Sequence, residues 1–186
     1  MKENVRSIIK TGAILLVIGF VCTLLLSLCN DMTKDRIASL AANAEQEAMT
    51  STLPIADKFV KLQYEGDGVV TAVYEGKNAE KEVVGYCVKA EPIGYGGTIS
   101  MIVGVDIDGK VTGVDIVNMS ETPGLGAKAN DAAFTEKFIG KSAGIKVRKS
   151  GAPADDEISA ISGATVTSKA VTSGVNAAIA AAESLR

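Results

Sequence analysis

The stretch SMIVGVDIDGKVTGVDIVN, residues 100–118, decides the fold class of this chain. β-Branched residues recur on both sides of Asp108-Gly109, a dipeptide typical of tight hairpin turns. The pattern predicts two antiparallel strands, 100–107 and 111–118, with little bulk on one face. Two more strands are predicted upstream: residues 69–74 are apolar with interspersed Thr and Ala, and apolar residues alternate along 82–89.

Two helices are expected after these strands in the chain. Residues 168–185 carry an apolar stripe that ends at Leu185, which is typical of an amphipathic helix packed on a core. A shorter helix is expected at 130–139, where Phe134 and Phe138 are four residues apart and face the core together. A loop and a short strand follow, up to about residue 150. The fold class is therefore α+β, with a mixed or antiparallel sheet and packed helices.

The N-terminal region predicts a membrane anchor. Residues 11–29 contain no charge and are long enough for one membrane-spanning helix. Three basic residues precede this run, whereas the charges after it balance, so the N-terminus is expected in the cytoplasm and the rest outside. A signal peptide and a lipoprotein cleaved before Cys29 are alternatives, but no Ala-x-Ala site closes the run and Leu28 precedes the cysteine.

These features divide the chain into four parts. Residues 1–10 are the cytoplasmic N-terminus, 11–29 the membrane span, 30–53 a helical stalk and 54–186 the extracytoplasmic domain. Pro54 is expected to end the stalk helix, because proline cannot continue a helix.

The composition excludes several function classes. The net charge of −3 gives no nucleic-acid footprint. The chain has no histidine, so His-dependent nucleophilic catalysis and imidazole metal sites are ruled out. Its three cysteines show neither a disulfide framework nor metal-ligand spacing. We assign no catalytic residue and no metal site.

Two short motifs offer binding chemistry. SGATVTS, residues 162–168, places hydroxyls and a glycine turn at a helix start, where unpaired N–H groups suit a phosphate. Taken alone, the motif is better explained by Thr167 or Ser168 as an N-cap. ETPGLG, residues 121–126, is a loop whose glycines allow unusual backbone angles. Taken alone, that loop is an ordinary connection between a strand and a helix.

Together the two motifs resemble the FMN-binding domains of the RnfG and NqrC subunits of bacterial respiratory complexes. The resemblance runs from about residue 80 to the C-terminus, includes Gly94-Tyr95-Gly96-Gly97, and extends to the N-terminal anchor. It implies that Thr165 carries FMN through a phosphoester bond. It also implies a set of cofactor-binding residues around the flavin: Ser162, Gly163, Ala164, Thr167, Ser168, Glu121, Thr122, Gly124, Leu125 and Gly126. Lys128 is either a solvated lysine or a balance for the phosphate charge.

The chain departs from the family pattern at two places. Met119 and Ser120 stand where the family often has a histidine before the loop. Ser159 stands six positions before Thr165, where an acidic residue is usual, and residues 155–157 bring acids nearby but out of register. If the flavin transferase, of the ApbE type, needs that acid, attachment is affected.

The function implied by the resemblance is electron transfer at the cell membrane. The chain would be a single-pass subunit of an ion-translocating ferredoxin:NAD⁺ oxidoreductase of the Rnf type, beside integral-membrane and iron–sulfur subunits. An NqrC-like subunit of a Na⁺-translocating NADH:quinone reductase is the alternative within the family, although such subunits usually carry longer insertions. An independent FMN-domain reductase and a membrane-anchored binding or structural module without flavin stay open as other classes.

Overall fold

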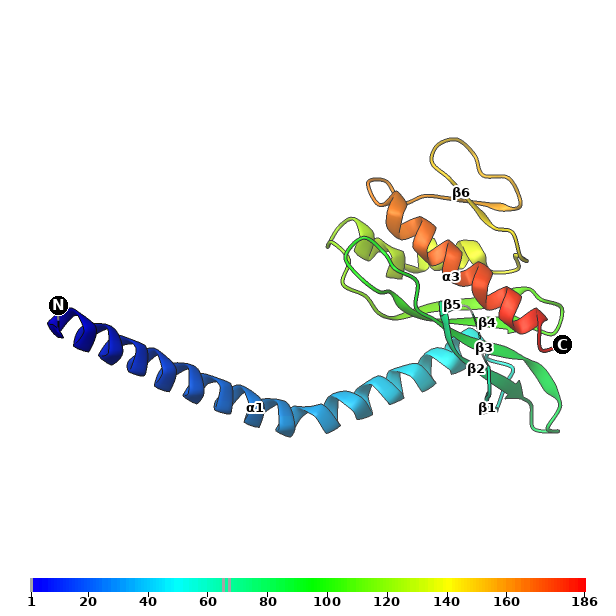
Figure 1. Cartoon of the computed structure of the whole chain (residues 1–186). Coiled ribbons are helices and arrows are strands. Elements are labelled where there is room, and N and C mark those ends of the chain that lie inside the picture. Colours follow the sequence, from blue (N-terminus) through cyan, green and yellow to red (C-terminus); the bar gives the residue numbers. More distant parts are fainter. Residues whose placement is uncertain (1, 65, 67) are drawn as a thin grey trace. The chain divides into compact units, whose positions relative to one another are not determined.

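The computed structural model describes residues 2–64, 66 and 68–186. The chain forms two compact units, one up to Asn43 and one from Ala44 to Arg186 (Figure 1). Within the described residues, the first unit is helical throughout and the second contains all the strands.

The first unit belongs to a single long helix, α1 (Lys2–Thr52). Large apolar side chains in its span are mostly exposed: Leu16 is 71 %, Phe20 66 % and Leu26 70 % exposed. Within the described residues, α1 is the one helix long and apolar enough to cross a membrane. This confirms the expected apolar N-terminal helix. The helix ends two residues before Pro54, as predicted.

The last turns of α1 belong to the second unit. Ala48, Met49 and Leu53 are buried together with Cys87 and Ile102 of the sheet. Burial raises the pKa of the Cys87 thiol to about 12. Residues 44–53, which were expected in the stalk, are therefore part of the folded domain.

The core of the domain is a five-stranded antiparallel sheet in which neighbouring strands are consecutive in the chain. Its strands are β1 (Lys58–Leu62), β2 (Val70–Lys77), β3 (Val83–Ala90), β4 (Ser100–Asp106) and β5 (Val111–Asn118). The predicted hairpin is confirmed, and its turn is closed by hydrogen bonds between Asp106 and the N–H groups of Asp108 and Lys110. β1 was not predicted, because this edge strand is half exposed and shows no clear alternation.

The two faces of the sheet are covered by different helices. On β4, Met101, Val103 and Val105 pack in one cluster, whereas the intervening Ile102 packs with the end of α1. The larger cluster includes the apolar stripe of α3 (Thr165–Glu183), which lies across β2, β3 and β4 (Figure 1). The predicted C-terminal amphipathic helix is thereby confirmed.

Short elements connect β5 to α3. They are η1 (Gly126–Asn130), α2 (Ala132–Thr135), η2 (Glu136–Phe138), β6 (Lys146–Arg148) and β7 (Glu157–Ser159), the last two forming a parallel pair. The single helix expected at 130–139 is wrong in form, since one α-turn sits between 3₁₀ turns. Phe134 and Phe138 are nevertheless buried, with ring centroids 5.5 Å apart edge to face.

The start of α3 differs from the predicted one. The helix begins at Thr165, and its N-cap is Ala164, which makes no side-chain capping bond. The expectation that Thr167 or Ser168 is the N-cap is therefore wrong. Gly163, with φ +77°, and the bond from Ala164 N–H to the Ile161 carbonyl close the turn early. The Ser168 hydroxyl lies inside the first turn, where it donates to the Ala164 carbonyl and accepts from Ile161 N–H.

Candidate functional site

A pocket of about 520 Å³ opens where three segments of the domain meet. Tyr95 contributes from the loop between β3 and β4, and a second wall comes from the loop after β5. The third wall is the turn and first helical residues of α3. The lining residues are Tyr95, Glu121, Thr122, Leu125, Gly126, Gly163, Ala164, Thr165, Val166 and Thr167.

Most of the residues that the two motifs nominate meet in this pocket. Ser162, Gly124 and Ser168 do not line it: the first two are exposed beside it, and Ser168 is fully buried behind the first turn of α3. Lys128 also lies outside the lining. Two lining residues were missed. Val166 lies inside the SGATVTS motif. Tyr95 lies in the Gly-Tyr-Gly-Gly segment, whose glycines were the signal that could have indicated it.

The pocket has the positive end of a helix at its base. Thr165, half-buried, is the first residue of α3, and the N–H groups of a helix's first turn have no intrahelical acceptor. The N-cap residue Ala164 makes no side-chain capping bond to them. The helix dipole adds partial positive charge at the same place. Among the described residues that line the pocket, none is lysine or arginine. The helix start is therefore its feature suited to a phosphate.

Glycines allow the pocket walls to approach one another. A Cβ on Gly126 would lie 2.4 Å from Glu121 Oε2 and 2.8 Å from Thr167 Oγ1. A Cβ on Gly96 would lie 2.1 Å from the Ser120 carbonyl oxygen. Side chains cannot occupy these positions without moving the loops. Gly163 and Gly124 instead have φ values of +77°, which L-residues rarely adopt.

Of the lining residues that the structure describes, Glu121 alone is acidic, and it is only 8 % exposed. Its Oε1 accepts hydrogen bonds from Tyr95 N–H at 2.7 Å and Gly96 N–H at 3.2 Å. Its Oε2 accepts from the Thr167 hydroxyl at 3.0 Å. One carboxylate thus contacts all three walls.

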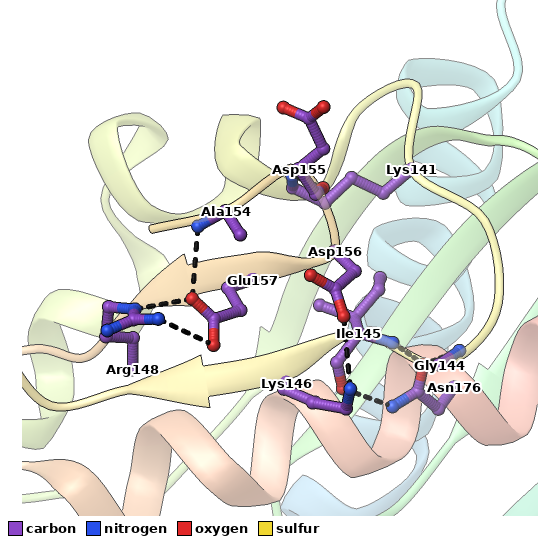
Figure 2. A network of polar contacts seen from close by, with 10 residues as sticks. All are labelled: Lys141, Gly144, Ile145, Lys146, Arg148, Ala154, Asp155, Asp156, Glu157 and Asn176. Atoms are coloured by element: carbon purple, nitrogen blue, oxygen red, sulfur yellow. Dashed lines mark hydrogen bonds and ion pairs between the residues drawn. The ribbon is translucent and has the colours of Figure 1, made fainter. Parts of the chain in front are cut away.

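The segment that precedes the SGATVTS motif carries a separate polar network (Figure 2). On β7, Glu157 binds the Arg148 guanidinium through both oxygens, and this pairing lowers the pKa of the Glu157 carboxyl. Lys146 pairs with Asp156 at 3.1 Å. Ser159, at the position where an acid was expected, ends β7, and its carbonyl accepts a bond from Lys137 at 3.4 Å.

The arrangement suits the binding of a phosphate-bearing ligand better than acid–base chemistry. Within the part of the chain that the structure describes, no cluster of His, Cys, Asp or Glu is placed to hold a metal ion. The pocket combines apolar side chains, close backbone and uncapped helix N–H groups. A flat organic cofactor with a phosphate group fits this donor set.

Comparison with known proteins identifies both parts of the chain. Residues 94–180 match the family model for an FMN-binding domain, and residues 1–51 match that for the RnfG N-terminal region. The chain is 37 % identical to the G subunit of the Na⁺-translocating ferredoxin:NAD⁺ oxidoreductase complex of Acetobacterium woodii, over 94 % of this chain and 91 % of the relative. It is 34 % identical to the G subunit of the proton-translocating complex of Clostridium ljungdahlii, over 86 % and 83 %.

A solved structure shows the same fold. The C subunit of the Na⁺-translocating NADH-quinone reductase from Parabacteroides distasonis aligns with a TM-score of 0.52 and 24 % identity, covering 68 % of this chain and 76 % of that one. The two G-subunit relatives are more similar in sequence and are matched over most of their length. The chain therefore belongs to the RnfG family, which supplies the G subunit of ion-translocating oxidoreductase complexes, and it contains that family's FMN-binding domain.

Proposed function

We propose that this protein is a membrane-anchored electron carrier that holds FMN as a phosphoester on Thr165, within an ion-translocating ferredoxin:NAD⁺ oxidoreductase complex. The observation that carries the proposal is the position of Thr165. It lines the pocket and is also the first residue of α3, so its side chain lies beside the uncapped N–H groups. The names of the G-subunit relatives support membership of such a complex.

The first turn of α3 would serve the phosphate in two ways. Its N–H groups would donate to the phosphate oxygens, and Gly163 would leave the phosphate room to approach the turn. Ester formation joins the Thr165 oxygen to phosphorus, the hydroxyl proton is lost, and a phosphoanhydride P–O bond of the flavin donor breaks. The donor for a separate transferase would therefore be a flavin dinucleotide, from which a nucleoside monophosphate leaves.

The remaining walls would enclose the organic part of the cofactor. Tyr95, Leu125 and Val166 are 45–76 % exposed around the pocket, so they offer apolar surface to a ring system. When bound, FMN supplies the exchange of one or two electrons, and the side chains supply binding and orientation. Thr122 would remain beside the ring or ribityl chain, as the resemblance implies.

The flavin would lie outside the cytoplasm in this proposal. Lys2, Arg6 and Lys10 precede the apolar span, whereas the charges after it balance. A covalent tether suits a flavin on that side, where lost FMN is not recovered. Protease added to spheroplasts should then remove residues after the span. Protection of the domain in intact spheroplasts would contradict this orientation.

The attachment claim is tested by flavin fluorescence in a denaturing gel, with the full chain produced beside an ApbE-type flavin transferase. Wild type should give a fluorescent band, and Thr165→Ala should give none. Ser162→Ala is the matched control, because it removes an exposed hydroxyl from the same turn outside the pocket. A dark wild type, or a Thr165→Ala band as bright as wild type, would sink the claim. If wild type is dark and Ser159→Asp gives a fluorescent band, the missing acid at position 159 is what prevents attachment.

The alternatives make different predictions for the purified protein. A binding or structural module would carry no flavin before denaturation either. An independent reductase would pass electrons to an external acceptor without other subunits. A subunit of the Rnf type should instead co-purify with integral-membrane and iron–sulfur subunits. The chain is 24 % identical to the solved NqrC-type structure, a likeness that shows a shared fold and does not favour the Nqr alternative.

A further inference from the structure

The most unusual group in the domain is the buried carboxylate of Glu121. It is more than nine-tenths buried, yet its hydrogen-bond partners in the described part of the chain are uncharged donors. A buried carboxylate is costly unless donors satisfy it. Here the donors are two backbone N–H groups and one hydroxyl, and they come from two segments far from Glu121 in sequence.

The surroundings are shaped around that carboxylate. A Cβ on Gly94 would lie 2.2 Å from Glu121 Oε1, and one on Gly126 would lie 2.4 Å from Oε2. Glycine at both places leaves the space that the two oxygens fill. The loop at 94–97 therefore contacts Glu121 through its backbone, and the Thr167 hydroxyl donates to the same carboxylate.

We propose that Glu121 is a positioning residue of the flavin pocket, which joins the loop at Tyr95 and Gly96 to Thr167 of α3 and so fixes the walls around the cofactor. The inference rests on FMN occupying this pocket. It changes the role that the family resemblance implies for Glu121, from a residue that binds the cofactor to a clip that joins two walls of its pocket. Three of the acceptor positions of the carboxylate already have donors.

The clip gives Thr167 and Glu121 a shared effect. If the hydroxyl of Thr167 acts through Glu121, removing either side chain breaks the same contact between α3 and the loop after β5. If Glu121 contacts the flavin by itself, the two losses are independent and add. Gln at 121 keeps the clip, because its amide oxygen accepts from Tyr95 and Gly96 while its nitrogen donates to the Thr167 oxygen.

The experiment uses the full chain with its flavin, purified in detergent after production beside a flavin transferase. The variants are E121A, E121Q, T167V and the double variant E121A/T167V. T172V is the matched control, because the buried Thr172 hydroxyl donates to the Ser168 carbonyl within α3. The readouts are the visible circular dichroism of the flavin and the quenching of its fluorescence by acrylamide, which is uncharged. Far-UV circular dichroism checks folding.

E121A and T167V should both change the flavin dichroism and raise the quenching constant, and the double variant should go no further than E121A. E121Q and T172V should match wild type. Additive effects in the double variant, a wild-type signal from T167V, or a change in E121Q equal to that in E121A would overturn the proposal. If E121A does not fold, T167V against T172V and E121Q decides.

The same preparation separates the two proposals. Flavin that is present in the native protein but absent from the denaturing gel contradicts the ester on Thr165 and leaves the test of Glu121 intact. A wild type without flavin before and after denaturation contradicts both. Additive effects with a fluorescent gel band contradict the clip alone.

Discussion

The domain contains two polar networks of opposite kind. Around Glu121, three neutral donors surround one buried carboxylate, and the residues that meet there come from three separate segments. Around β6 and β7, charged residues pair within a short stretch of chain (Figure 2). The side chains of Lys146 and Asp156 are 71 % and 55 % exposed.

The difference shows which network holds the site. Exposed ion pairs contribute little, because water and salt screen them and long side chains lose freedom in forming them. A buried acceptor is expensive to leave without its donors. We therefore expect the pocket to depend on the few bonds of Glu121 and to tolerate loss of the ion pairs beside it.

The largest effect is expected from Gly126→Ala. The added methyl would lie 2.4 Å from Glu121 Oε2 and 2.8 Å from Thr167 Oγ1, at the centre of the buried network. Overpacking of this kind costs about 1–3 kcal/mol of unfolding free energy, and bound flavin should fall with it. Urea unfolding of the flavin-free chain, followed by tyrosine fluorescence, measures the unfolding free energy. Gly19→Ala is the control: it adds the same methyl where nothing lies within 4 Å, and it should change neither the unfolding free energy nor the bound flavin.

Asn176→Ala should have the next largest effect, although Asn176 lies beside the exposed network (Figure 2). Its side chain accepts from the N–H groups of Gly144 and Ile145 and donates to the Ile145 carbonyl. Loss of these bonds should cost about 1–3 kcal/mol in the same urea experiment. Ser173→Ala, exposed on the same helix, is the control. Equal unfolding free energies of Asn176→Ala and Ser173→Ala would show that the hydrogen bonds between Asn176 and the backbone do not stabilise the domain.

A network of intermediate burial lies at the end of α1. Burial tends to raise the pKa of Glu45, but hydrogen bonds from Lys89 and Tyr74 outweigh it and lower that pKa. The resulting stability is present above the unfolded pKa of Glu45 and is lost as pH falls through the lower folded value. Glu45→Gln should cost at most about 1 kcal/mol near neutral pH.

Melting temperatures between about pH 7 and pH 3 test this contribution. Wild type should lose stability more steeply on acidification than Glu45→Gln. Parallel curves for the two proteins would mean that Glu45 is not the group responsible.

The smallest effect is expected from Arg148→Gln. The variant removes the pair with Glu157 at an exposed position and returns the lowered pKa of that carboxyl toward its usual value. Stability and flavin content should stay close to wild type, and the small difference should vanish in high salt. A loss as large as that of Gly126→Ala would reverse the comparison between the networks.

The sequence predicts most of the framework because its signals are local. The hairpin turn at Asp108-Gly109, the apolar span and the stripe of the last helix each depend on neighbouring residues. The start of α3 was misplaced by three residues, because Thr and Ser serve equally well as caps and as hydroxyls that bond inside a first turn. Strands β1 and β7 have no local signature beyond their pairing partners.

The site is predictable only in part for a related reason. The two motifs mark the walls of the pocket, but the bond between Thr167 and Glu121 joins residues 46 positions apart. No local pattern shows that Tyr95 closes the third side, or that Glu121 has its oxygens directed to backbone donors. Such contacts follow from the register of the sheet and the closeness that glycine allows.

The central claim is that FMN is esterified to Thr165, and peptide mass spectrometry tests it most directly. Trypsin should release residues 150–169, which carry Thr165 together with other hydroxyls. We predict that this peptide gains the mass of FMN less one water, and that fragmentation places the addition on Thr165. An unmodified peptide from flavin-transferase-treated protein, or an addition on another hydroxyl of the same peptide, would contradict it.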